Sequence, residues 1–304
     1  MPLTHGLRPL DGRARTWSLL DLDPDLARTL SSDRRALAYT DLRVRVHQRR
    51  RGAWPMTAAQ GGSITPHLGV LILDGVIASD ILLEDVISTE LLGPGEVLRP
   101  WPLDASEHLL SDQPRWTVLS DCRVALLDQR VAAALTHYPE IYTVLLERMD
   151  TRARRFATTQ AIAQLNRVDR RVLSMLWHLA ERWGRISTDG VVIPLDISHR
   201  LLAQLVGACR PTVSTALAQL ARQGLVQRRT DGAWLLHGDP PGTPNTGDET
   251  LLSRRLLFVE QRRAQGHCDE HIEGVELTLR RLQRDTAPFE TDLTPSYGAV
   301  AEAR

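Results

Sequence analysis

The sequence predicts an α+β protein in which a β-rich N-terminal half is followed by one long helix and a small helical domain closed by a β-hairpin. Three observations support this order. Short apolar segments separated by turns continue to about residue 127. An apolar stripe at helical spacing then runs from Ile141 to Leu165. Helical spacing resumes at Val168 and continues to Asp231-Gly232, an Asp-Gly pair between apolar segments that is typical of a hairpin turn.

The N-terminal half is predicted to be a polar arm over residues 1–20 and a small β-barrel or sandwich over residues 21–138. A short helix is expected around residues 24–37. Alternating polar and apolar residues predict a strand over residues 39–47, because side chains of a strand point to opposite faces in turn.

Three further segments supply the rest of the predicted sheet. Residues 68–78 are apolar around Asp74-Gly75, which predicts two strands joined by a tight turn. Residues 81–92 are rich in β-branched side chains and end at Gly93-Pro94-Gly95, a strong signal for chain reversal. Residues 116–127 alternate again and predict another strand.

The long helix is predicted over residues 139–165, with Pro139 in its first turn, where a missing N–H costs little. An amphipathic helix must bury its stripe. The residues alone leave two alternatives for what covers it, a second copy of the chain or the flank of the barrel. The candidate interface residues are Ile141, Val144, Leu145, Met149 and Phe156.

Residues 166–238 are predicted to form the C-terminal domain. Its first helix should end at Trp183-Gly184, with the glycine as the stop. Residues 239–304 are expected to form a linker rich in proline and glycine and then a helical extension over residues 249–286. The sequence leaves open that this extension recruits a partner.

Two helices meeting at a sharp turn are predicted within residues 198–220, SHRLLAQLVGACRPTVSTALAQL. Ser198 can cap the first helix, and Gly207 permits the turn. Leu202, Leu205 and Val206 would be buried in the first helix, and Val213, Leu217 and Leu220 in the second. That arrangement leaves a polar tip of one arginine and several hydroxyls facing outward, which suits a helix that enters the major groove of DNA.

The alternative is an ordinary helical hairpin whose polar residues face solvent. Three neighbouring features favour a winged helix-turn-helix instead: a preceding helix, a following β-hairpin and a local excess of positive charge. Residues 151–238 contain thirteen arginines and five acidic residues, an excess of eight, although the chain as a whole is neutral. The predicted DNA-binding residues are Ser198, Arg210, Pro211, Thr212, Ser214 and Thr215 on the helices, with Arg228 and Arg229 at the hairpin tip.

The chain resembles the cyclic-AMP receptor protein/Fnr family of bacterial regulators over roughly residues 20–238. The resemblance rests on LLAQLVGACRPTVSTALAQLARQGLV, RVDRRVLSMLWHLAERWG and DGAWLLHG in the C-terminal part. It rests more loosely on LGVLILDGVIA, LLGPGEVLRPW and WTVLSDCRVALLD, which are similar to parts of the cyclic-nucleotide-binding β-roll. The resemblance implies a sensor β-roll, a long dimerisation helix and a winged helix-turn-helix.

The family pattern also assigns expected roles and partners. It implies a homodimer that binds two DNA half-sites about one helical turn apart, with RNA polymerase as a further partner. Arg210 would pair with guanine and Thr212 with phosphate. Pro211 replaces an acidic residue that many members have, and Thr215 replaces a second arginine. The resemblance therefore does not predict which DNA sequence the chain binds.

No cofactor is predicted. Nucleotide-binding members carry an arginine followed closely by Ser or Thr, and the nearest match here is Arg115-Trp116-Thr117, where the indole would crowd a phosphate. The scattered Cys122, Cys209 and Cys268 supply neither a zinc site nor an iron–sulfur cluster. For His47, His67, His108 and His137, the residues leave haem ligation as an alternative to solvated or packed positions, which are far commoner for histidine.

The competing class is a cupin-like metalloenzyme on the β-roll. It would need two histidines and a carboxylate gathered on neighbouring strands, and the chain has no His-x-His pair. No apolar run approaches the roughly 20 residues that cross a bilayer, and the N-terminus lacks the apolar core of a secretion signal. We therefore expect a cytoplasmic DNA-binding regulator rather than an enzyme.

Overall fold

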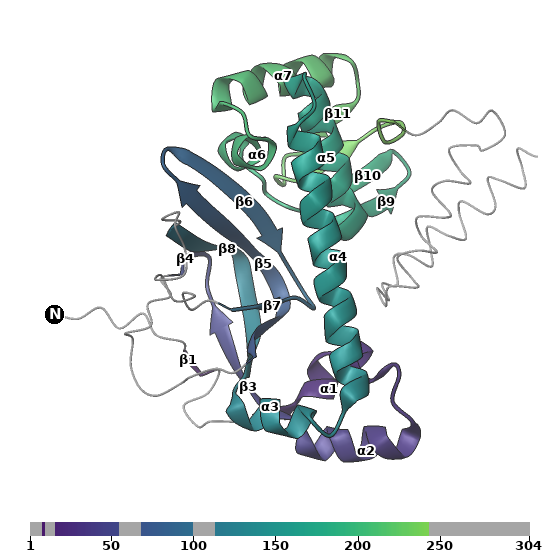
Figure 1. Ribbon diagram of the computed structural model, residues 1–304. Coiled ribbons are helices and arrows are strands. Elements are labelled where there is room, and N and C mark those ends of the chain that lie inside the picture. The colour runs from purple at the N-terminus through teal and green to yellow at the C-terminus, as the bar shows by residue number, and fades with distance from the viewer. Residues whose placement is uncertain (1–7, 10–15, 55–67, 100–112, 243–304) are drawn as a thin grey trace, which may run out of the picture.

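The computed structural model describes residues 8–9, 16–54, 68–99 and 113–242. The β-sheet domain lies beside the long helix α4 (Pro139–Ala163), and the small helical domain lies around the C-terminal part of this helix (Figure 1). The predicted α+β class and the order of its parts are confirmed. The predicted helix over residues 249–286 and most of the N-terminal arm lie outside the described residues. Among the helices that are described, none is long and apolar enough to cross a membrane.

The segment before the sheet differs from the prediction. Two short strands and two short helical turns come first: β1 (Arg8–Pro9), β2 (Thr16–Ser18), α1 (Leu19–Leu22) and η1 (Pro24–Ala27). The predicted helix over 24–37 is divided, because η1 ends at Ala27 and helix α2 (Ser32–Asp41) begins only at Ser32. The strand predicted from residue 39 is therefore too early. Helical bonding continues to Leu42, whose N–H donates to the carbonyl of the buried Ala38.

Besides β1 and β2, the antiparallel sheet contains β3 (Arg43–Arg49), β4 (Gly52–Ala53), β5 (Gly69–Leu83), β6 (Val86–Leu92), β7 (Val97–Leu98) and β8 (Gln113–Leu127). Its strand order is β1-β3-β8-β5-β6, with β2 paired to β3, β4 to β8 and β7 to β5. The two 15-residue strands, β5 and β8, form its centre.

Asp74-Gly75 is a bulge inside β5, so the prediction of two strands joined by a turn there is wrong. The register between β5 and β8 shifts between Ile72 and Ile77. Gly75 has a φ of +82°, and a Cβ at this position would lie 2.4 Å from the Cβ of Cys122. The Asp74 carboxylate accepts from the backbone N–H of Arg123 at 2.6 Å. Residues that favour a turn thus form a β-bulge here. The sequence of this segment fits a hairpin turn and a bulge equally well, and only the pairing with the neighbouring strand distinguishes them.

Both faces of the sheet are covered. One face, with Leu71 and Leu127, packs against the N-terminal helices, helix α3 (Gln129–Leu135) and the first turns of α4. The other face, with Ile72 and Val124, forms the interior of the roll. Asp128 caps α3 by accepting from two backbone N–H groups.

The C-terminal domain combines three helices with a four-stranded sheet in the order β11-β12-β10-β9. The predicted hairpin is confirmed as β11 and β12. Gly184 ends the first helix for a different reason than expected: its φ is −64°, but a Cβ would lie 2.4 Å from the carbonyl oxygen of Ala180. The elements are α5 (Val168–Trp183), β9 (Arg185–Ser187), β10 (Gly190–Ile193), α6 (His199–Val206), α7 (Arg210–Arg222), β11 (Val226–Arg228) and β12 (Trp234–Leu236).

The two domains share one apolar core. Val76, Ala78 and Leu91 of strands β5 and β6 belong to the same buried cluster as the inward residues of α5, α6 and α7. Helix α6 lies against β6. The helical domain is therefore docked on the edge of the sheet.

Candidate nucleic-acid interface

Helices α6 and α7 form the predicted helix-turn-helix. The hydroxyl oxygen of Ser198 accepts from the backbone N–H of Leu201 at 3.1 Å and caps α6. Gly207 ends α6 in the left-handed conformation, with φ +60° and ψ +48°. Such a φ is strained for residues with a Cβ, which explains glycine at the turn. The scaffold predicted from the sequence is confirmed.

The two faces of α7 differ as predicted. Val213, Leu217 and Leu220 are buried in the shared core together with Ala216. At the N-terminal end, Arg210, Pro211 and Thr212 are exposed, and Thr215 follows one turn later. Helix α7 lies at the end of the molecule opposite α2 and α3 (Figure 1). An arginine with short hydroxyl side chains is therefore free to approach a groove of DNA.

Two hydroxyls of α7 already have partners within the protein. Thr215 donates to the carbonyl oxygen of Pro211 at 3.2 Å. Ser214 is half-buried, and its Oγ lies 2.9 Å from Nδ1 of His199. His199 is not among the site residues predicted from the sequence. Burial lowers the pKa of this imidazole, and the charges of Arg228 and Arg210 lower it further.

The two wing arginines have different surroundings. Arg228 donates to the carbonyl oxygen of Ile197 and to the Asp196 carboxylate, each at 2.6 Å, and its guanidinium lies 4.4 Å from the centre of the Trp234 ring. It therefore helps to hold the wing against the domain. Arg229 is exposed and pairs only loosely with Asp231 at 3.3 Å. Contact of either residue with DNA stays a prediction, and Arg229 is the more available of the two.

Part of the predicted dimer interface on α4 is wrong. Ile141 and Val144 are fully buried against the sheet domain, and Leu145 packs beside them. Met149 and Phe156 are exposed, with relative accessibilities of 62% and 43%. The helix thus has two apolar faces, and the broken stripe predicted from the sequence mixes them.

The exposed face of α4 includes two residues that the prediction missed, Tyr142 and Leu146. With Met149, Ala153 and Phe156 they are spaced by four, three, four and three residues. This is the repeat by which two helices pack along a common seam. The spacing is present in the sequence and separates these residues from the buried face.

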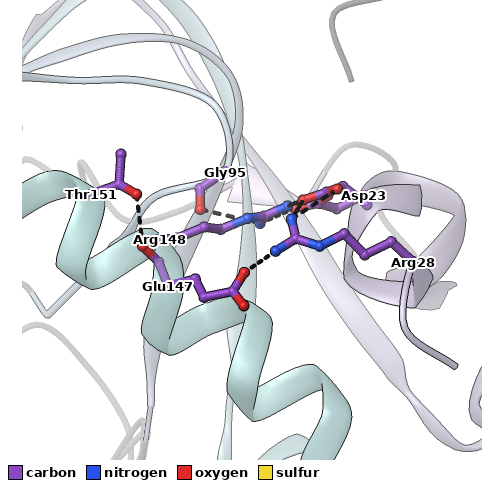
Figure 2. A network of polar contacts seen from close by, with 7 residues as sticks. Asp23, Arg28, Gly95, Glu147, Arg148 and Thr151 are labelled. Atoms are coloured by element: carbon purple, nitrogen blue, oxygen red, sulfur yellow. Dashed lines mark hydrogen bonds and ion pairs between the residues drawn. The ribbon is translucent and has the colours of Figure 1, made fainter. Parts of the chain in front are cut away.

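A polar network fixes α4 to the N-terminal segment (Figure 2). Arg148 pairs with Asp23 at 2.6 Å and with Asp25 at 2.8 Å, and it also donates to the carbonyl oxygen of Gly95 at 3.2 Å. Arg28 pairs with Glu147 one residue earlier on the helix. Burial would raise the pKa of Asp25, but Arg148 and Arg28 outweigh it and hold that pKa below its ordinary value.

A second ionic cluster joins the two domains at Glu96. This carboxylate is buried, with 5% of its side chain exposed, and it pairs with Arg182 of α5 at 2.8 Å and Arg155 of α4 at 3.1 Å. It also accepts from the backbone N–H of Gly93 at 2.9 Å. Arg182 in turn donates to the carbonyl oxygen of Pro94. Sequence patterns give no indication of this cluster, because its members are distant along the chain.

A cavity of about 210 Å³ lies between the roll and α4. Its walls are mainly apolar, including Leu68, Leu127 and Leu145, and Arg148 and Arg152 also line it. Both arginines are engaged by carboxylates of the chain. Trp116 is partly buried against the interior cluster of the roll. Residues 100–112, which follow β7, lie outside the described part of the chain.

Of the histidines named as candidate ligands, the structure describes His47 and His137. His47 is buried in β3, whereas His67 and His108 lie outside the described residues. Within residues 8–9, 16–54, 68–99 and 113–242, no three His, Cys, Asp or Glu side chains form a group able to hold a metal ion.

Comparison with known proteins agrees with the geometry of the C-terminal domain. The family model of the Crp-like helix-turn-helix domain matches residues 170–238. The CRP-like cAMP-activated global transcriptional regulator of Mycobacterium tuberculosis is 32% identical over 124 residues, which are 40% of this chain and 54% of that protein. The global nitrogen regulator of Synechococcus elongatus is 33% identical over 95 residues, 31% of this chain and 42% of that protein.

The overall fold also has a solved counterpart. A cyclic nucleotide-binding domain containing protein from Listeria monocytogenes matches with a TM-score of 0.51 at 17% identity, over 70% of this chain and 96% of that one. This likeness shows a shared fold. The chain matches only about half the length of the curated relatives. The predicted resemblance to the cyclic-AMP receptor protein/Fnr family is confirmed, and the named relatives are regulators rather than enzymes.

Proposed function

We propose that this protein, whose residues 170–238 match the Crp-like helix-turn-helix domain, is a sequence-specific transcription regulator. The observation that carries the proposal is the exposed tip of α7 on a buried apolar scaffold. Arg210 is the residue of this tip that can donate two parallel hydrogen bonds to O6 and N7 of guanine. Thr212, two residues later, would meet a phosphate, and exposed arginines nearby would contribute attraction that does not depend on sequence.

We further propose that it acts as a homodimer through the exposed face of α4, Tyr142, Leu146, Met149, Ala153 and Phe156. An apolar seam with this repeat is stabilised when a second helix covers it. Two copies related by a twofold axis would present two α7 helices to half-sites about 34 Å apart. The target would then be an inverted repeat. A regulator of this kind would act in the cytoplasm, where bacterial DNA is located. Contact with RNA polymerase stays a prediction, and no residue is assigned to it.

Selection from a pool of randomised DNA duplexes tests the proposed function. The full chain should enrich an inverted repeat with half-sites about one helical turn apart, and each half-site should contain a guanine. Binding to the enriched duplex should weaken as salt rises, since arginine contacts release counterions from DNA. Recovery of no common sequence would contradict sequence-specific binding.

Met149→Asp should convert the dimer to a monomer. A carboxylate at the middle of the seam would be desolvated without a partner whenever two helices pack. We expect light scattering to report a dimer for the wild type and a monomer for the variant at micromolar concentration. Glu147→Gln, also exposed on α4 but outside the seam, is the control. A variant that remains dimeric would place the interface elsewhere.

We propose that the sensor domain does not use cyclic AMP, although the M. tuberculosis relative is named as cAMP-activated. Arg115 is followed by the bulky Trp116, and the arginines beside the cavity already pair with carboxylates. A ligand at about a hundred times its Kd would stabilise the fold by about 2.7 kcal/mol. We therefore expect no change in Tm on adding cyclic AMP. A rise with cyclic AMP that AMP does not produce would contradict this proposal.

A further inference from the structure

His199 is the first residue of α6, and its side chain lies against α7, the helix that we expect to enter the groove of DNA. Its Nδ1 is 2.9 Å from Oγ of Ser214 on α7, and its ring centre is 6.2 Å from that of Trp234 on β12. Ser214 belongs to the face of α7 that we expect to meet DNA. The imidazole is therefore connected to that face by a single hydrogen bond.

The charges around His199 are mainly positive. Arg210 acts from the start of α7 and Arg228 from β11, and Asp196 offsets Arg228, with which it pairs at 2.6 Å. Burial and these two arginines hold the pKa of His199 below its ordinary value of 6.5. The ring is therefore neutral near pH 7 when no DNA is bound.

Resting on the proposed function, we propose that His199 is a positioning residue for Ser214 and takes up a proton when DNA binds. Phosphates that approach Arg210 and the wing bring negative charge to the same place. They offset the repulsion that opposes protonation of the imidazole. Because the bound complex then favours the charged ring, binding and protonation support each other.

Proton uptake also changes what Ser214 can offer to DNA. A neutral ring protonated on Nε2 accepts the hydroxyl proton of Ser214 at Nδ1, which turns that proton inward. A charged ring carries a proton on Nδ1 and must donate to the serine oxygen. The hydroxyl proton is then free to point outward, toward a phosphate oxygen or the acceptor edge of a base.

The sign of the pH effect follows from the two protonation equilibria. The pKa of His199 is higher in the complex than in the free protein, so DNA affinity is greatest below the free pKa. It falls as pH rises through the pKa of the complex. A rise of one pKa unit on binding corresponds to an affinity gain of about tenfold.

The test measures Kd for the selected duplex by fluorescence anisotropy at about pH 5.5 and about pH 8.0, at constant salt. We compare the wild type with His199→Asn, which keeps a hydrogen-bonding group near the position of Nδ1 but does not titrate. His237→Asn is the matched control, since His237 belongs to the same domain and bonds to the Asp189 carbonyl. Calorimetry at about pH 6.5 in two buffers of different ionisation enthalpy measures proton uptake directly.

We expect the wild type and His237→Asn to bind about tenfold more tightly at the lower pH, and His199→Asn to show less than a twofold change. Calorimetry should show proton uptake by the wild type and a smaller uptake by His199→Asn. Equal pH profiles for the wild type and His199→Asn would overturn the inference. Absence of sequence-preferring binding by the wild type at either pH would instead contradict the proposed function itself.

Discussion

Arg210→Ala is expected to bind the selected duplex roughly 10- to 100-fold more weakly than the wild type, because a bidentate contact to guanine contributes about 1–3 kcal/mol of discrimination. Its affinity for unrelated duplexes should change little. Arg210 is exposed at the first position of α7 and is not a member of the shared core. Its removal should therefore leave the fold intact, and preference between bases should be lost rather than binding in general.

Competition between the selected duplex and a scrambled one, followed by anisotropy, measures this effect. Arg222→Ala is the matched control, because it removes the same exposed side chain from the opposite end of α7. The control should keep the preference and lose at most the attraction of one charge. If Arg210→Ala discriminates between the duplexes as well as the wild type does, another residue recognises the base, and the tip of α7 is wrongly assigned.

The helix-turn-helix could be predicted from the sequence because its determinants are local. Ser198 caps, Gly207 turns and Val213 faces inward, each within a short segment whose helical spacing fixes the geometry. The polar tip could be predicted for the same reason. What the sequence could not supply was contacts between elements that are distant along the chain, such as the ion pair of Arg228 with Asp196.

Predictions from the sequence are wrong where a segment distant along the chain decides the local structure. Gly75 permits either a hairpin or a bulge, and only the pairing of β5 with β8 selects the bulge. The apolar positions of α4 likewise fall on two faces, and the sheet domain covers one of them. The structure shows that Ile141 and Val144 are buried, and helical spacing then assigns the remaining apolar residues to one face or the other. Without that information, the sequence does not decide whether a second copy of the chain or the sheet domain covers the apolar residues of α4.

Glu96→Gln is expected to lower Tm by about 5–10 °C, since removing one partner of a buried ion pair costs about 3 kcal/mol or more. Two guanidinium groups, from Arg155 and Arg182, approach this single carboxylate. Burial holds the pKa of Arg182 below its ordinary value, and the charge of Glu96 opposes that effect only in part. Glutamine preserves the shape and one acceptor oxygen, which can serve the Gly93 N–H and Arg182. Its NH2 group would then face Arg155, where the carboxylate has its other oxygen, so the expected loss comes from the missing charge and from this missing acceptor. Differential scanning fluorimetry measures it.

The control is Glu147→Gln, which removes the charge of a carboxylate that is 54% exposed. Because exposed ion pairs contribute at most about 1 kcal/mol, its Tm should stay within a few degrees of the wild type. If both variants have the same Tm, the cluster at Glu96 does not stabilise the docking of the two domains.

The double variant Glu96→Gln, Arg182→Met separates charge from packing. Replacing a buried pair by uncharged groups of similar volume is often neutral, whereas leaving one member behind is costly. The double variant should therefore recover most of the Tm lost in Glu96→Gln. Arg155 is 30% exposed and can turn its guanidinium to solvent once the carboxylate charge is gone. If the second change lowers Tm further, Arg182 stabilises the domain contact through its remaining contacts, including the Pro94 carbonyl and the Trp183 ring, rather than through its charge pair with Glu96.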